Sequence, residues 1–194
     1  MLYHQPVYKE DGRMDVDSSI KKAYEAILSG DFEQAILHFD EAIALEPTNG
    51  AAYYKCSITC ARSGKWQKAL ALAEQAVSLS PEHMEYQFHL ENVKAKALVI
   101  EAESILSNSP ARTEDALELL HEASRLDPLN IEALLMLGAA YATLNRYDEA
   151  AACARDAVRL EPEHSAARRL FADMNRRSRT LRAKSGRTKR RRNR

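Results

Sequence analysis

Residues 28–47 read LSGDFEQAILHFDEAIALEP, and residues 143–162 read TLNRYDEAAACARDAVRLEP. Both stretches end in a leucine, an acidic residue and a proline. Two further stretches end alike, with Asp127 before Pro128 and with Ser80 in the acidic position before Pro81. The four prolines, Pro47, Pro81, Pro128 and Pro162, are 34, 47 and 34 residues apart. A repeat of this length is one supersecondary unit that cannot bury its apolar face alone, so we expect the units to stack and share a continuous core.

Small residues recur in register with these prolines. Alanine stands twelve and five residues before each proline, at Ala35, Ala69, Ala116 and Ala150, and at Ala42, Ala76, Ala123 and Ala157. Small side chains at helical spacing predict pairs of helices that approach closely. Gly30 and Gly64, and Asn145 in the equivalent place, are expected to end the first helix of each pair in the left-handed conformation.

This pattern resembles the tetratricopeptide repeat (TPR), a helix-turn-helix of 34 residues. The resemblance covers roughly Asp17 to Ala172, and in the first unit Lys22 departs from it, because the family prefers leucine there. The last unit carries the signature most fully, at Leu134, Leu137, Gly138, Tyr141, Tyr147, Ala150, Ala157 and Pro162. The second unit matches at Tyr53, Gly64, Trp66, Ala69, Ala76 and Pro81.

The resemblance implies an all-α solenoid of four helix-turn-helix units and a C-terminal capping helix. We expect an extended N-terminal segment over residues 1–16 and the solenoid over residues 17–173. Its units are predicted at about 17–48, 49–82, 83–129 and 130–163. The basic residues 174–194 are expected to be a disordered tail. Leu2, Tyr3, Val7 and Tyr8 form a short apolar segment that is expected to occupy a groove of this or a neighbouring copy, or to fray.

The third unit is 13 residues longer than the others, and the excess lies between Glu82 and Thr113. The region has no strong helix breaker before Ser107, so it predicts one helix of about 26 residues. An apolar seam runs along it at Tyr86, Leu90, Val93, Ala97 and Ile100, flanked by Leu98, Ala102 and Ile105. This seam either packs wholly on repeats two and four or forms a surface for a partner or a dimer.

A formal net charge of zero hides a strong asymmetry along the chain. Residues 163–194 carry 13 Lys or Arg and two acids, a net of +11, so residues 1–162 carry a net of −11. The basic residues of the tail are Arg176, Arg177, Arg179, Arg182, Lys184, Arg187, Lys189, Arg190, Arg191, Arg192 and Arg194. They indicate affinity for a polyanion, with nucleic acid first and an anionic membrane next, or an intramolecular contact with the acidic body.

Stacks of this family hold peptides on a concave surface formed mainly by their first helices, and the resemblance transfers that groove by register. The implied groove residues are Ile20, Tyr24, Ile27, Tyr54, Ile58, Arg62, Phe88, Asn92, Lys96, Leu135 and Ala139. This lining is apolar and aromatic with a few cationic points, which suits an apolar segment of a partner. The clamp by which one subclass holds chaperone termini is not matched, because its positions hold Ile20, Tyr24, Lys55, Glu85 and His89.

No catalytic motif is present in the sequence, which lacks a phosphate-binding glycine loop, a nucleophile elbow and a metal-spaced cluster. We therefore predict no catalytic residue, cofactor or metal. Cys56 and Cys60, one helical turn apart, favour buried reduced thiols over a metal or redox pair. Without a secretion signal or a long apolar run, a cytoplasmic protein-binding scaffold is the favoured interpretation. The alternative is a nucleic-acid- or ribosome-associated protein whose tail dominates binding.

Overall fold

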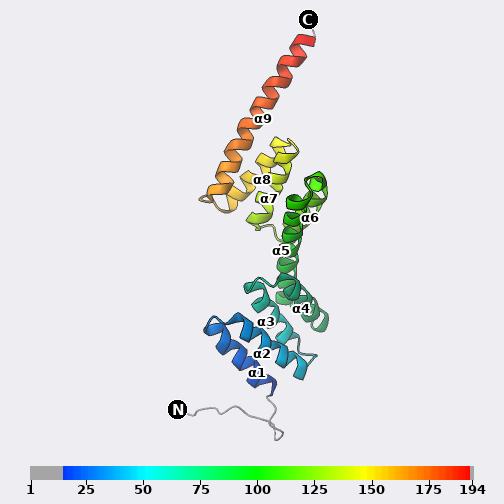
Figure 1. The fold of residues 1–194 in the computed structure, drawn as a ribbon, viewed down its shortest axis with the longest axis vertical. Coiled ribbons are helices and arrows are strands. Elements are labelled where there is room, and N and C mark those ends of the chain that lie inside the picture. Colours follow the sequence, from blue (N-terminus) through cyan, green and yellow to red (C-terminus); the bar gives the residue numbers. More distant parts are fainter. Residues whose placement is uncertain (1–14, 193–194) are drawn as a thin grey trace. The chain divides into compact units, whose positions relative to one another are not determined.

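The computed structural model describes residues 15–192, without the side chains of Pro110 and of residues 184–192. Over that range the chain forms α-helices, one short 3-10 helix and no strand (Figure 1), which confirms the expected all-α fold. The helices are α1 (Val16–Leu28), α2 (Phe32–Leu45), α3 (Gly50–Arg62), α4 (Trp66–Leu79), α5 (Met84–Asn108), η1 (Pro110–Arg112), α6 (Thr113–Leu126), α7 (Ile131–Thr143), α8 (Tyr147–Leu160) and α9 (Ser165–Arg192). The apolar segment predicted near the N-terminus lies outside the described residues.

The chain divides into two compact units, and the boundary falls within α5, between Ala97 and Leu98. We call residues 15–97 the N-terminal unit and residues 98–192 the C-terminal unit. In the N-terminal unit, α1 packs on α2, α2 on α3 and α3 on α4. In the C-terminal unit, α6 packs on α7, α7 on α8, and α9 on both α8 and α7. Each helix therefore contacts helices that are near it in sequence, as expected of a stacked repeat.

The chain reverses between paired helices at the positions that the sequence predicted. Gly30 and Gly64 have φ angles of 81° and 79°, and Asn145 has a φ of 60°. Glycine adopts this left-handed conformation without steric cost, and asparagine is among the few other residues that tolerate it. These three residues end the first helices α1, α3 and α7, and thus set where the second helix of each pair begins.

Side chains that accept backbone hydrogen bonds mark the start of several helices. Asp15 caps α1, Asp31 caps α2, Asn49 caps α3 and Asn130 caps α7, each accepting from the amide three residues later. Each cap satisfies one of the amide groups that the first turn of a helix leaves unpaired.

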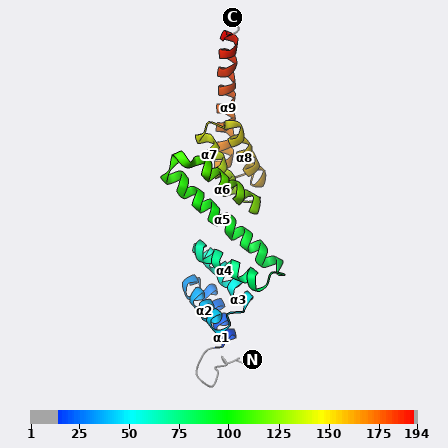
Figure 2. The same cartoon turned by 90° about the vertical axis from the view of Figure 1, so that its right-hand side faces the viewer.

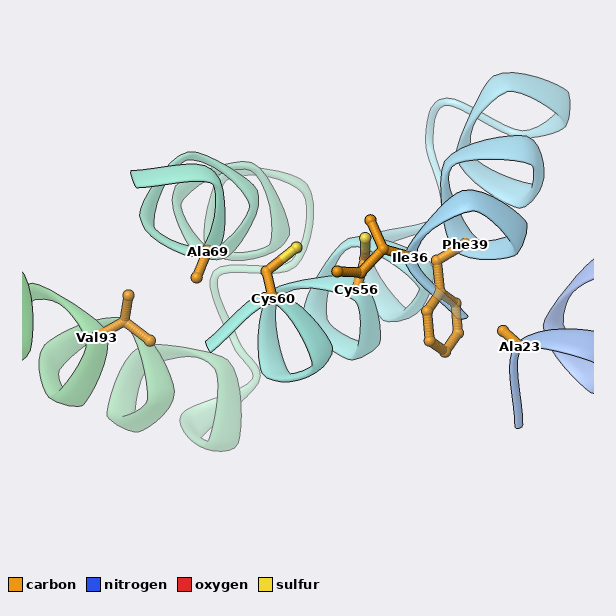
Figure 3. Packing of buried hydrophobic residues seen from close by; sticks show 7 residues of the cluster. All are labelled: Ala23, Ile36, Phe39, Cys56, Cys60, Ala69 and Val93. Carbon is orange, nitrogen blue, oxygen red and sulfur yellow. The ribbon is translucent and has the colours of Figure 1, made fainter. Parts of the chain in front are cut away.

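The repeating alanines form the contacts between paired helices. All eight of them, four at each of the two repeat positions, have no exposed surface, which confirms the predicted register. In the N-terminal unit they lie beside larger core residues, of which Phe39 is the largest fully buried side chain. Figure 3 shows Phe39 of α2 next to Ala23 of α1. In the same view, Cys56 and Cys60 of α3 lie between Phe39 and the side chains of Ala69 (α4) and Val93 (α5).

The long third-unit helix is confirmed, because α5 runs unbroken for 25 residues and is seen along its length in Figure 2. Its predicted seam is only partly buried. Tyr86 and Val93 are buried, whereas Leu90, Ala97 and Ile100 are half-buried. The burial of Ala95, Val99 and Ala102 shows that a second stripe of α5 also enters the core.

The end of the chain differs from the prediction of a disordered segment over residues 174–194. Helix α9 continues through Arg192 and extends past the end of α8 (Figure 1). Its contacts with the repeats reach beyond residue 173, because Met174 is buried and the Ser178 hydroxyl donates a hydrogen bond to Asp148 at 2.6 Å. Arg182 also binds Asp148, at 2.8 Å. These contacts hold the first part of the basic segment in a helix, and lysine, arginine and alanine favour its continuation.

The cysteines are free thiols, as expected. Cys56 and Cys60 are buried without exposed surface, which confirms a packing role. The hydrogen bond between the two thiols, together with burial, raises the pKa of Cys56, and burial raises the pKa of Cys153 to about 11. Within the described residues, no three His, Cys, Asp or Glu side chains gather as metal ligands would.

Candidate functional site

The predicted groove residues fall in both units. Those from Ile20 to Lys96 lie on α1, α3 and α5 of the N-terminal unit, and Leu135 and Ala139 lie on α7 of the C-terminal unit. Ile20 and Ile27 pack against the buried core cluster, so part of their surface belongs to the core. Ile58, Asn92, Lys96 and Tyr54 are half-buried, and Arg62 is exposed.

Two aromatic side chains of the N-terminal unit are exposed to solvent. Tyr24 on α1 is 44% exposed and Phe88 on α5 is 66% exposed. The ring of Tyr24 contacts Phe39 edge-on, and the Lys55 ammonium lies 5.4 Å from the centre of the Tyr24 ring. A cation over an aromatic face is a favourable contact, so this part of the surface is aromatic and cationic.

Tyr54 belongs to a cluster of rings between α3 and α5. It stacks on Tyr86 with 4.5 Å between ring centres and meets His89 edge-on at 5.4 Å. His83 also stacks on Tyr86, with 4.8 Å between ring centres. We call these four residues the aromatic cluster. Burial raises the pKa of the Tyr54 hydroxyl. Sequence reasoning placed Tyr86 only in the α5 seam and missed this grouping, because it depends on how α5 lies against α3.

His89 is held in place by a hydrogen bond and by burial. The Ser57 hydroxyl donates to the carbonyl oxygen of Ala69 at 2.7 Å, so its oxygen accepts from Nε2 of His89 at 2.8 Å. Burial lowers the pKa of His89. The chain Ala69–Ser57–His89 thus links α4, α3 and α5 and fixes the histidine ring against Tyr54.

The C-terminal unit has a hollow of about 570 Å³ beside α7. Its lining comes from α5, from α7 and from the turn between α8 and α9. The lining residues are Glu103, Ile131, Glu132, Leu135, Met136, Ala139, Glu161 and His164. The lining therefore includes Leu135 and Ala139, which the sequence placed in the groove. It also includes three glutamates that the sequence analysis did not place there.

A second hollow, of about 340 Å³, shares Ala139 with the first. Its other lining residues are Leu106 of α5, Thr113 of α6, Ala140 and Thr143 of α7, and Leu144 directly after α7. The exposed Ala139 thus borders both hollows, and its small side chain leaves them open. The missed lining residues Glu103 and Leu106 lie in the part of the third unit where the insertion made the repeat register ambiguous.

His164 has a structural role at the edge of the larger hollow. Its Nδ1 accepts a hydrogen bond from the amide of Ala167 at 3.3 Å, so the ring caps the start of α9.

The basic residues of α9 are partly engaged with acids of the C-terminal unit. Arg176 and Arg177 both pair with Asp173, and Arg182 pairs with Asp148. Hydrogen bonds from Ser178 and Arg182 lower the pKa of Asp148, and the arginines lower that of Asp173. Arg179 is exposed. The side chains of Lys184 to Arg192, and Arg194, lie outside the described residues.

Comparison with known proteins identifies the family. Residues 21–161 match the family described as the cilia and flagella-associated protein 70 middle TPR-like domain. This chain belongs to that TPR-like family. The fold agrees: the solved structure of MamA from Desulfovibrio magneticus RS-1 superimposes with a TM-score of 0.52 at 19% identity, over 88% of this chain and 89% of that one. A second TPR-like neighbour, another MamA structure, has a TM-score of 0.51 at 16% identity, over 84% and 82% of the two chains.

Curated relatives match a shorter part of this TPR-like chain. The Hsp70-Hsp90 organizing protein of Triticum aestivum is 39% identical over 66 residues, which is 34% of this chain and 11% of that protein. Hsp70-Hsp90 organizing protein 2 of Arabidopsis thaliana is 36% identical over the same length, 12% of its chain. The match thus spans about a tenth of these relatives. Among helices α1 to α9 as described, none has both the length and the apolar character needed to cross a bilayer.

Proposed function

We propose that this chain is a non-enzymatic interaction scaffold that binds apolar segments of partner proteins on the surfaces of its first helices. The observation that carries the proposal is the larger hollow beside α7, whose lining includes the apolar residues Ile131, Leu135, Met136 and Ala139. Concave sites with an apolar floor and a few polar groups at the edge are the usual form of binding sites. Membership of a TPR-like family supports a binding role rather than catalysis.

The N-terminal unit adds a second surface to the proposed scaffold. The exposed rings of Tyr24 and Phe88 are large apolar groups held on two different helices. Aromatic side chains contribute strongly to protein interfaces because they bury a large area at a low cost in side-chain entropy. By repeat register, Ile58, Arg62, Asn92 and Lys96 belong to the same proposed groove.

A selection of displayed random peptides on the full chain tests this proposal. Selected peptides should lose about tenfold or more in affinity for Ala139→Trp, because the indole would fill the space that both hollows share. Ala71→Trp is the matched control, since Ala71 is also an exposed helical alanine but lies on α4. Circular dichroism establishes that both variants fold. If no selected peptide is sensitive to Ala139→Trp, the hollow is not a binding site.

We further propose that the basic segment adds affinity for a polyanion such as nucleic acid. Residues 174–194 hold eleven Lys or Arg and no acid, and one of these residues, Arg179, is exposed on α9. If about six to eight cations meet phosphates, the logarithm of the affinity for duplex DNA should fall with log salt at a slope of roughly −5 to −7. Deletion of residues 183–194 should flatten that slope. An unchanged slope would remove the tail from the binding site.

A further inference from the structure

We infer that the larger hollow beside α7 selects partner segments in which an apolar side chain is flanked by lysine or arginine. This inference rests on the proposed binding role of the hollow and specifies the chemistry of its ligand. Three glutamates line the hollow, and they come from three separate places in the chain: Glu103 on α5, Glu132 on α7 and Glu161 after α8. The four apolar lining residues lie on α7, along with Glu132.

The charge of the lining has one sign. Of the eight described residues that line the hollow, three are glutamates and none is Lys or Arg. Carboxylates around a concave, low-dielectric wall focus a negative potential into it. An acidic segment would be repelled, and a neutral one would gain nothing from the glutamates.

The arrangement suits the shape of a lysine or arginine side chain. Such a side chain can lay its methylene groups along an apolar surface while its charged end reaches the edge. In this hollow the apolar lining residues would contact the methylene groups and a central apolar residue of the partner. Glu103 and Glu161 would pair with the ammonium or guanidinium groups of its flanking residues. Charge complementarity of this kind selects partners and raises the association rate.

The test uses two pools of labelled short peptides, measured by fluorescence anisotropy on the full chain. Both pools have a central Leu, Ile or Met, and this residue is flanked on both sides by lysines in one pool and by glutamines in the other. The lysine pool should bind more tightly. Replacing Glu103 and Glu161 together by glutamine should weaken the lysine pool about three- to tenfold, and leave the glutamine pool within about twofold.

The matched control is Glu74→Gln with Glu118→Gln, which removes the same charge from exposed positions on α4 and α6. It should leave both pools nearly unchanged. Equal binding of the two pools, or equal effects of the two double variants, would overturn the inference. A different outcome is self-association of the chain that disappears when Glu103 and Glu161 are both replaced by glutamine. That result would overturn the assignment to a partner protein, because the basic segment of a second copy would then occupy the hollow.

Ala139→Trp separates this inference from the broader proposal. If Ala139→Trp abolishes binding of both pools while the glutamate variant changes neither, the hollow binds peptides but does not select basic ones. If Ala139→Trp has no effect on either pool, the binding role of the hollow itself fails.

Discussion

The two units of the molecule use the same helix pairs but expose different chemistry on their first helices. In the N-terminal unit, α1, α3 and α5 expose Tyr24 and Phe88, and Lys55 lies over the Tyr24 ring. In the C-terminal unit, α7 borders a hollow whose lining includes four apolar residues and three glutamates. The repeating alanines, by contrast, are completely buried in both units. The fold thus fixes the contacts between helices and leaves the surface positions free to differ, so binding must be inferred from the surface of each unit.

The largest expected effect tests whether the two units unfold independently of each other. Phe39→Ala removes the largest fully buried side chain, in the N-terminal unit, and should cost about 3 to 5 kcal/mol. The single tryptophan, Trp66, also packs against that core, so its fluorescence reports unfolding of the N-terminal unit. Leu120→Ala, at a fully buried position of the C-terminal unit, should cost about 2 to 5 kcal/mol. The Trp66 transition in urea should move far more with Phe39→Ala than with Leu120→Ala.

Leu37→Ala is the control for this pair, because Leu37 lies on the same helix as Phe39 and is 53% exposed. It should shift the Trp66 transition by less than about 0.5 kcal/mol. Equal shifts of the Trp66 transition in Phe39→Ala and Leu120→Ala would show that the two units unfold as one, and the comparison would then apply to their surfaces alone.

A smaller effect should distinguish the units by their response to acid. The pKa of His89 in the folded N-terminal unit is held below its ordinary value of 6.5, whereas the unfolded chain has the ordinary value. Below that pH the unfolded state therefore binds more protons, and the free energy of unfolding falls as the pH drops, levelling off below the folded pKa. Urea unfolding followed by Trp66 fluorescence at about pH 7.5 and about pH 5 measures the loss.

Other groups also titrate over this range, so the prediction is a difference between variants. His89→Gln should show a smaller loss of stability in acid than the wild type, because the glutamine cannot be protonated. His83→Gln, which removes an exposed ring of the same aromatic cluster, should retain the loss of the wild type. If His89→Gln and the wild type lose the same free energy of unfolding in acid, the buried His89 is not the cause of that loss.

Sequence reasoning predicted the features of this fold that depend on local geometry. The buried alanines, the left-handed Gly30, Gly64 and Asn145, and the length of α5 all follow from the identity and spacing of residues. Features that depend on distant contacts were missed. The contact of Ser178 with Asp148 joins residues 30 apart and holds part of the basic segment in α9.

The candidate site was predicted only in part, for a similar reason. Leu135 and Ala139 were found because they occupy repeat positions on a regular helix. Glu103 lies in the region between Glu82 and Thr113 that carries the 13 extra residues, so the repeat register did not reach it. Glu161 lies in a turn, and the groove was transferred from positions on the first helices only. Such residues come together only when α5, α7 and the α8–α9 turn are placed around one space.

The pattern of neighbouring contacts also bears on how quickly this chain folds. In each unit the helices pack on partners one or two helices away in sequence, as α7 does on α6, α8 and α9. Proteins whose contacts are this local close only short loops on the way to the native state, and they fold in microseconds to milliseconds. Each hairpin of helices can therefore form soon after its second helix leaves the ribosome, before the rest of the chain has been synthesised.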